Sequence, residues 1–365
     1  MPRIYLDYNA TCPIRPEVIE IVRETMTNHG NASSIHADGR QARKIVEDAR
    51  AAVAGMVGAS AKQVIFTSGA SESNNTILRG FEDYRILISA IEHPSVYFCG
   101  RNVEIIPVHS NGLINLEKLE DLLQKSDQPT LVSVMMANNE TGVIQPVKEI
   151  TKLAKGYNAT VHTDAVQAAG RFEVDFKDLD VDFMSLSAHK MGGPQGVGAL
   201  IMRQGLNPPK FMYGGGQERR QRAGTENVSG IAGFGVAADL AVKEIEDFKA
   251  LKTLREKMES HMRSSSNRVT IYGIDAPRVS NTIACTVKDM DSAVFMMNLD
   301  LEGVSISTGA ACSSGQVKPS RVLMAMGVPE ELAKTGLRIS MGWDTKEAEI
   351  DRFLEIWTKL IQRLD

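Results

Sequence analysis

The chain has few cysteines, and their spacing excludes the usual cysteine-based sites. Only Cys12, Cys99, Cys285 and Cys312 occur in 365 residues, and no two of them form a Cys-x-x-Cys pair. This spacing argues against a zinc site, and disulfides are not expected in a large chain without a secretory signal. We expect Cys285, within the strand-like run TIACTV, to be a core residue, and we favour structural roles for Cys12 and Cys99.

Long apolar runs and an excess of positive charge are also missing. No apolar run reaches the roughly 18 residues that a membrane span needs. The formal net charge of -4 supplies no basic field for a nucleic acid. The first residues, MPRIYLDYNATCP, contain no apolar signal core. We therefore expect a cytoplasmic protein with no nucleic-acid or membrane partner.

Two common nucleotide-binding motifs are absent as well. The small-residue turn SGASESNN follows the strand-like run QVIFTS and leads into a helical pattern. It has neither the GxGxxG nor the GxxxxGK[ST] spacing. Small residues before a helix N-terminus nevertheless suit a phosphate, because backbone N–H groups converge there. An ordinary strand-to-helix turn is an equally good interpretation of this stretch alone.

Short apolar runs alternate with helical patterns along most of the chain. Residues 42, 46, 49, 53 and 56 form one apolar helical stripe. The alternation predicts an α/β fold with a mostly parallel sheet covered on both faces. A long helical pattern runs from 226 to about 263, and the strand-like runs beyond it predict a smaller α/β unit. We expect a final amphipathic helix within residues 345–365.

Three polar residues follow apolar runs and together suggest a cofactor. Asp164 and Gln167 lie in HTDAVQ, and Lys190 lies in SAHKMGG, each just past a strand-like run. Open α/β sheets bind ligands at the carboxyl ends of their strands. A carboxylate can keep a pyridinium nitrogen protonated while a lysine forms a Schiff base with an aldehyde. A phosphate-binding turn, an Asp and a Lys in this chain order predict a pyridoxal phosphate site.

Four further residues are candidates for chemistry at such a site. His93, in SAIEHPSV, could stack on a pyridine ring, although a lone histidine after a strand is more often a cap. Asn139 is placed similarly and could donate to a phenolic oxygen. Arg338, in LRISMG, suits bidentate capture of a carboxylate, although a salt-bridged arginine is the commoner case. Cys312 lies in the small, polar stretch STGAACSSGQVKPS, where we expect a mobile loop and an accessible thiol.

These motifs together resemble a known enzyme family over nearly the whole chain. YLDYNAT, TSGASESNN, EHPSV, NNETGV, HTDAVQ, SAHKMGGPQGVGAL, RAGTEN and GAACSSG occur in the order typical of cysteine desulfurases of the NifS/IscS type. The resemblance implies the fold type I of pyridoxal phosphate enzymes, similar to aspartate aminotransferase, with a seven-stranded sheet. It implies a large cofactor-binding domain of residues 15–260, and a small domain of residues 1–14 and 261–365 that carries the cysteine loop.

The resemblance also implies roles for individual residues. Lys190 matches the Schiff-base lysine, Asp164 the partner of the pyridinium, and His93 the residue that stacks on the ring. Asn31 and Arg338 match positions associated with the substrate carboxylate. The other implied cofactor contacts are Ala70, Ser71 and Ser187 near the phosphate, Asn139 and Gln167 on the ring-oxygen side, His189 beside the lysine, and Thr225 at the phosphate of a neighbouring subunit.

The implied activity is a cysteine desulfurase, a sulfurtransferase that converts L-cysteine to L-alanine and leaves a persulfide on Cys312. The implied partners are a second copy of the chain and a sulfur acceptor for iron–sulfur cluster assembly or tRNA thiolation. No resident metal is implied, only transient contact of Cys312 with a cluster. A selenocysteine lyase, an aminotransferase of the same fold and a non-catalytic sulfur carrier remain alternatives. An aminotransferase would have no need of Cys312.

Overall fold

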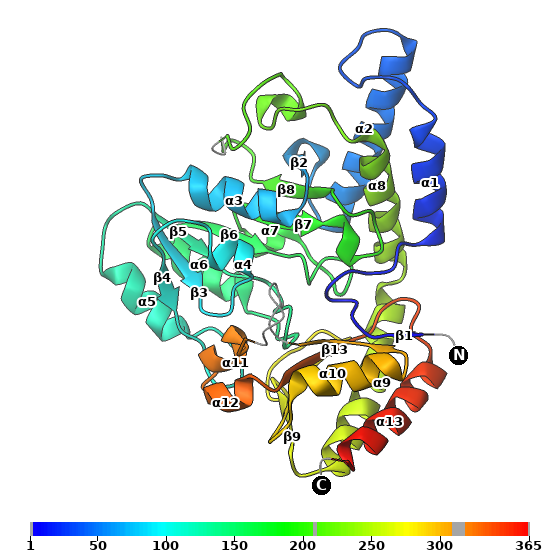
Figure 1. Ribbon diagram of the computed structural model, residues 1–365. Coiled ribbons are helices and arrows are strands. Elements are labelled where there is room, and N and C mark those ends of the chain that lie inside the picture. The colour runs from blue at the N-terminus through cyan, green and yellow to red at the C-terminus, as the bar shows by residue number, and fades with distance from the viewer. Residues whose placement is uncertain (1–2, 207–209, 309–317, 364–365) are drawn as a thin grey trace.

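The computed structural model describes residues 3–206, 210–308 and 318–363, and its larger part is built on one twisted sheet (Figure 1). The strand order is β2-β8-β7-β6-β5-β3-β4, and every neighbouring pair is parallel except those of β8. The strands are β2 (Val64–Thr67), β3 (Arg85–Ser89), β4 (Glu104–Ile106), β5 (Thr130–Ser133), β6 (Thr160–Asp164), β7 (Phe183–Ser187) and β8 (Gly198–Met202). The predicted mostly parallel, seven-stranded α/β fold is confirmed.

Both faces of this sheet are covered, as the continuous apolar runs of its strands require. Alternate side chains of one strand enter different cores: Leu87 of β3 lies in the main core, whereas Ile86 and Ile88 lie in the core on the other face. In β2, Phe66 and Ile65 divide in the same way. The strand ends consequently emerge between two helical layers.

Helices of different lengths form these layers. On one side, α1, α2 and α8 lie side by side (Figure 1), and a Cβ at Gly235 of α8 would lie 2.7 Å from the Ala49 Cα of α2. The predicted apolar stripe of α2 is buried over its full length. The helices are α1 (Pro16–Met26), α2 (Ala37–Met56), α3 (Ala70–Gly80), α4 (Pro94–Tyr97), α5 (Leu116–Gln124), α6 (Val147–Gly156), α7 (Phe176–Leu179) and α8 (Val228–Lys243).

The single long helix predicted from residue 226 to about 263 is wrong in one respect. Two helices occur there, α8 and α9 (Ile245–Ser265), separated at Glu244. The Glu244 carboxylate pairs with Arg15 at 2.6 Å. No glycine or proline stands at this break, so the sequence pattern gave no sign of it.

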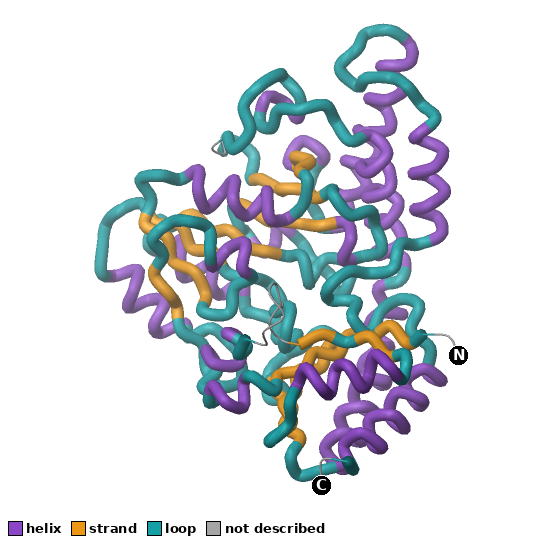
Figure 2. The backbone as a smooth tube through the Cα atoms, in the orientation of Figure 1, coloured by secondary structure: helices purple, strands orange, loops and turns teal. Residues whose placement is uncertain are grey.

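A second group of helices and strands lies below the main sheet in Figures 1 and 2, and a second core is packed among them. It contains Trp357 and Phe353, and it includes Ile4 and Leu6 from the start of the chain. An antiparallel sheet of order β12-β13-β10-β9 and the parallel pair β1-β11 surround it. The assignment of residues 1–14 and 261–365 to one small domain stays a prediction. The elements are β1 (Ile4–Tyr5), β9 (Val269–Tyr272), β10 (Thr282–Val287), α10 (Ser292–Leu301), β11 (Val304–Ser305), β12 (Ser307–Thr308), α11 (Arg321–Ala325), α12 (Glu330–Ala333), β13 (Gly336–Ser340) and α13 (Glu347–Ile361).

Within the described ranges, no helix combines the length and the apolar character that a bilayer crossing demands. Cys285 lies in the second core, as predicted, and Cys99 is buried under the main sheet.

Candidate active site

The predicted residues gather where the parallel strands of the main sheet end. Asp164 is the last residue of β6, Lys190 follows β7 by three residues, and His93 follows β3 by four. Because β3, β5, β6 and β7 are parallel, their carboxyl ends lie at the same edge, where such sheets bind ligands.

Lys190 presents a partly desolvated amine at this edge. A short 3-10 turn, η2 (Ala188–Lys190), carries it out of β7. Its Nζ donates to the backbone oxygens of Asn9 and Ala10, both at 2.7 Å. Burial, followed by the positive charges of Arg338 and Arg171, lowers the pKa of Lys190 to about 8. A neutral, nucleophilic amine is therefore accessible near neutral pH.

Asp164 is a buried carboxylate held by two neighbours. Asn74 Nδ2 of α3 donates to Asp164 Oδ2 at 2.8 Å, and the Val166 amide donates to Oδ1 at 3.0 Å. The side chain of Asn74 also contacts Ser95 Oγ at 2.9 Å. These two donors hold the Asp164 carboxyl group in place, where it can face a positive group of a ligand.

His93 contributes an uncharged imidazole. Its Nδ1 accepts from the Ser95 amide at 3.2 Å and lies 2.8 Å from Ser95 Oγ. Burial lowers the pKa of His93, although the charge of Asp164 opposes that shift. Because Nδ1 accepts a hydrogen bond, the proton of the neutral ring is on Nε2.

The N-terminus of α3 provides uncommitted backbone N–H groups beside this edge. Gly69 precedes the helix with φ of 152°, and no side chain caps its first turn. A Cβ at Gly198 of β8 would lie 2.7 Å from the Gly69 Cα, so glycine is required for this close approach. Ala70 and Ser71 form the first turn, where an anion is favoured. The predicted phosphate turn thus has suitable local geometry.

Three further predicted residues are Arg338 and His189, which have polar contacts with the protein, and Ser187, which is buried. Arg338 of β13 pairs with Asp7 at 2.8 Å, and its Nη1 donates to the Asn139 backbone oxygen at 3.2 Å. His189 Nδ1 lies 3.1 Å from Thr11 Oγ1, and burial lowers the pKa of His189 to about 4. Ser187 is buried at the end of β7.

Asn9 is a residue that the sequence interpretation missed, although it lies within the quoted motif YLDYNAT. Its backbone oxygen accepts from Lys190 Nζ and from Gln167 Nε2, the latter at 3.0 Å. Its side chain forms hydrogen bonds with Arg171 at 2.7 Å and with Thr282 at 2.9 Å. Its backbone N–H donates to Ser340 Oγ at 2.9 Å. Asn9 therefore connects the lysine and the glutamine of the site with strands β10 and β13.

Three predicted site residues are not joined to this group. The exposed Asn31 accepts from the Ser33 amide in its own turn. Thr225 is also exposed, and among the described residues its side chain has no hydrogen-bond partner. Cys312 lies outside the described residues. Within those residues, no group of three or more His, Cys, Asp or Glu side chains is placed to hold a metal ion.

The donor set suits a phosphorylated aromatic aldehyde. An amine that can be neutral, a buried carboxylate and an uncapped helix N-terminus match an aldehyde, a ring nitrogen and a phosphate respectively. In the described part of the chain, Gln167 Oε1 is buried without a hydrogen-bond partner, so it can accept from a bound group.

Comparison with known proteins then decides the family, since aminotransferase class V matches residues 4–353. The chain belongs to this family. This class V member is 39% identical to a cysteine desulfurase IscS of Dictyoglomus turgidum, in an alignment that covers 99% of the chain and 95% of that protein. It is 38% identical to an IscS of Methanosarcina thermophila, covering 99% and 92%. A NifS-like protein of Rickettsia africae superposes with a TM-score of 0.93 at 38% identity, over 99% of each chain. The resemblance inferred from the motifs is confirmed.

Proposed function

We propose that this class V aminotransferase is a cysteine desulfurase that uses pyridoxal 5'-phosphate. The observation that carries the proposal is the convergence of Lys190, Asp164 and His93 at one sheet edge. The full-length similarity to proteins named cysteine desulfurase supports the choice of reaction among those that this fold carries out. Sulfur would leave L-cysteine as a persulfide on Cys312, and L-alanine would be the second product.

The residues present fit the cofactor. Lys190 would hold it covalently, Asp164 would face its ring nitrogen, and His93 would lie against the ring. When bound, pyridoxal phosphate supplies an electron sink for the pair released at the substrate Cα. The other proposed holding residues are Ala70, Ser71 and Ser187 toward the phosphate, Asn139 and Gln167 toward the ring oxygen, and His189 beside Lys190.

The remaining chemistry belongs to the chain's own residues. Arg338 and Asn31 would bind the substrate carboxylate, Arg338 by exchanging part of its bond to Asp7. The Lys190 amine, once the substrate amine has taken its place on the cofactor, would take the Cα proton, since a lysine with a pKa near 8 is a competent base. The Cys312 thiolate would attack the substrate sulfur, forming an S–S bond as the Cβ–S bond breaks. The Cβ gains that electron pair and a proton, so Cβ is reduced by two electrons while the Cys312 sulfur and the substrate sulfur are each oxidised by one.

Two features support a homodimer with shared sites. Thr225 is exposed on the segment after η3 (Glu218–Arg220), where a partner subunit could receive it at its phosphate site. Phe211, Met212 and Tyr213, which lie before η3, expose large apolar side chains, as residues at subunit interfaces do. A sulfur-acceptor protein, in cluster assembly or tRNA thiolation, and a cytoplasmic location complete the proposal.

The decisive experiment measures both products from one reaction. Purified, cofactor-loaded protein is incubated with L-cysteine and a reductant, and alanine and sulfide are quantified together. We expect equal amounts of both. Cys312→Ser should keep the cofactor absorbance and lose sulfide, whereas Lys190→Ala should lose the covalent attachment. Sulfide from Cys312→Ser at the wild-type rate would refute the role of the thiol.

The same assay separates the alternatives. Amino transfer that depends on an added keto acid, without sulfide, would identify an aminotransferase. Preference for selenocysteine in competition with cysteine would identify a selenocysteine lyase. A purified protein that binds no pyridoxal phosphate would identify a non-catalytic carrier.

A further inference from the structure

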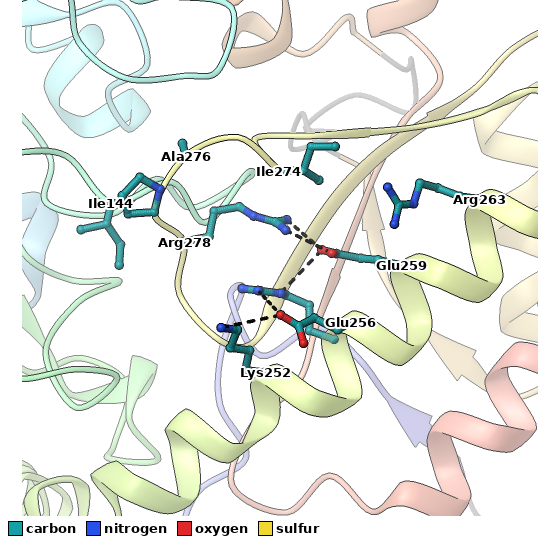
Figure 3. Close-up of a pocket in the computed structure, with 10 residues that line it drawn as sticks. Ile144, Lys252, Glu256, Glu259, Arg263, Ile274, Ala276 and Arg278 are labelled. Carbon is teal, nitrogen blue, oxygen red and sulfur yellow. Dashed lines mark hydrogen bonds and ion pairs between the residues drawn. The ribbon is translucent and has the colours of Figure 1, made fainter.

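A charged pocket lies apart from the site around Lys190. It has a volume of about 560 Å³ and opens between α9 and the loop of residues 274–278 (Figure 3). None of its lining residues belongs to the candidate active site. Its charged lining side chains are Lys252, Arg255, Glu256, Glu259, Arg263 and Arg278.

Positive charge exceeds negative charge in this pocket, with four cationic and two carboxylate side chains. Glu259 is already neutralised, because Arg278 Nη1 and Nη2 donate to its two oxygens at 2.8 and 3.1 Å. Glu256 is only loosely paired: its Oε1 lies 3.7 Å from Lys252 Nζ and 3.8 Å from Arg255 Nη2. The cations of the wall are therefore not fully compensated.

Arg255 carries a buried donor that the protein does not use. The residue is 6% exposed, and its Nη1 donates to the Val279 backbone oxygen at 2.6 Å. In the described part of the chain, its Nε has no hydrogen-bond acceptor, and the nearest charged oxygen, Glu259 Oε1, is 3.6 Å away. Burial and the neighbouring Arg278 lower the pKa of Arg255. An anion would relieve this unfavourable environment.

Arg263 lies one helical turn beyond Glu259, and it has no ion-pair partner among the described residues. Figure 3 shows Lys252, Glu256, Glu259 and Arg263 along α9 facing the loop that carries Arg278. Spacings of four, three and four residues place them on one helix face. Within the described residues, the exposed Arg263 without an ion pair and the buried Arg255 with an unpaired Nε donor thus line the same pocket.

We propose that this pocket binds a small organic dianion, a metabolite bearing a phosphate group or two carboxylates. Its volume fits a small metabolite, and arginine is the side chain that suits either kind of anion best. The excess of two positive charges matches a dianion in sign and amount.

The pocket also adjoins the segment that leads to the active site. Ile144 is one of its lining residues, and the Ile144 amide donates to the Pro277 backbone oxygen at 2.8 Å. The Val279 amide donates to the Gly142 oxygen at 2.9 Å, three residues after Asn139. An anion here would bind where the loop after Asn139 meets the segment of residues 277–279.

The test uses the cofactor-loaded full chain, in which the cofactor's own phosphate position is filled. Calorimetric titrations with inorganic phosphate and with succinate, at constant ionic strength set by chloride, measure affinity and stoichiometry. We expect one saturable site per chain for at least one probe, and the better probe identifies the class of dianion. Arg263→Gln should weaken binding of that probe about tenfold or more, which is the loss expected when one charge-assisted hydrogen bond is removed. Arg255→Lys, which keeps the charge but removes the Nε donor, should weaken it as well.

The matched control is Lys257→Gln on the same helix. Lys257 pairs with Asp351 at 2.5 Å and does not line the pocket, so this variant should bind like the wild type. Absence of saturable binding of both probes overturns the proposal, as does equal affinity of Arg263→Gln and the wild type. Because the readout is binding without cysteine, failure here leaves the desulfurase assay unaffected.

Discussion

The Asn74 side-chain amide donates to Asp164 Oδ2 at 2.8 Å, so a helix residue orients the carboxylate at the end of a strand. We predict that Asn74→Ala weakens pyridoxal phosphate binding about 10- to 100-fold, since a hydrogen bond to a buried charge contributes about 1.5–3 kcal/mol. Titration of the cofactor-free protein with pyridoxal phosphate measures the effect. The control is Asn75→Ala, which removes bonds to the Ser71 and Ser95 backbone oxygens only and should change the affinity by less than about threefold. Equal losses in both variants would contradict the role of Asn74.

The depressed pKa of Lys190 predicts how proton removal from the substrate depends on pH. Burial and the charges of Arg338 and Arg171 lower this pKa to about 8, so the neutral, basic form increases as pH rises through 8. We expect the rate of Cα deuterium exchange in bound L-alanine to rise up to about tenfold per pH unit below 8 and to level off above it. Exchange followed by NMR in the Cys312→Ser variant isolates this step from sulfur transfer. A rate independent of pH between 6 and 9 would exclude Lys190 as the base with this pKa.

The buried pair Arg50–Glu218 fixes the segment before Thr225 to the main sheet. Glu218 accepts from Arg50 at 2.6 and 2.9 Å and from the Phe66 amide of β2 at 2.8 Å. Glu218→Ala leaves the buried Arg50 guanidinium with only the exposed Glu47, 3.1 Å from its Nε, as an ionic partner, so we expect the free energy of unfolding to fall by about 3–5 kcal/mol. Urea unfolding measures this loss. Glu20→Ala, which breaks an exposed pair with Arg23, should leave the unfolding midpoint unchanged.

Glu140 predicts a second pH effect, on stability. Burial raises the pKa of Glu140 to about 7, against the opposing hydrogen bond from Ser320 Oγ at 2.5 Å. The folded chain therefore holds this proton more tightly than the unfolded chain does. The stabilisation is complete below about pH 4.5 and is lost as pH rises to about 7, a change of up to roughly 3 kcal/mol.

Glu140→Gln removes this ionisation and keeps a polar side chain. Subtracting the variant's free energy of unfolding from that of the wild type, at each pH from 4.5 to 8, isolates the contribution of Glu140. We expect the difference to change in favour of the variant as pH rises. A constant difference over this range would mean that Glu140 has an ordinary pKa in the folded protein.

The sequence predicted the elements and the site edge because both have local signals. Each strand of the main sheet is a short apolar run, and Asp164 and Lys190 follow such runs directly. Parallel pairing then brings them to one edge without knowledge of any tertiary contact. The anion-suited turn before α3 was equally visible, since small residues separate a strand from a helix.

The supporting contacts could not be predicted, because they join residues distant in the chain. Asn74 and Asp164 are 90 positions apart, and Asn9 and Arg171 are 162 apart. No periodicity links such pairs, although Asn9 and Asn74 both stood within recognised motifs. The break at Glu244 was missed for another reason: neither glycine nor proline marks it.

The contacts of Asn9 have a consequence for synthesis of the chain. Its amide bonds to Ser340, 331 positions later, while its backbone oxygen holds Lys190. A ribosome synthesises Asn9 more than three hundred residues before it reaches Ser340 of β13. The edge that carries Lys190 can therefore gain its full set of contacts only after β13 has been synthesised, and a nascent chain stalled before β13 should bind pyridoxal phosphate poorly.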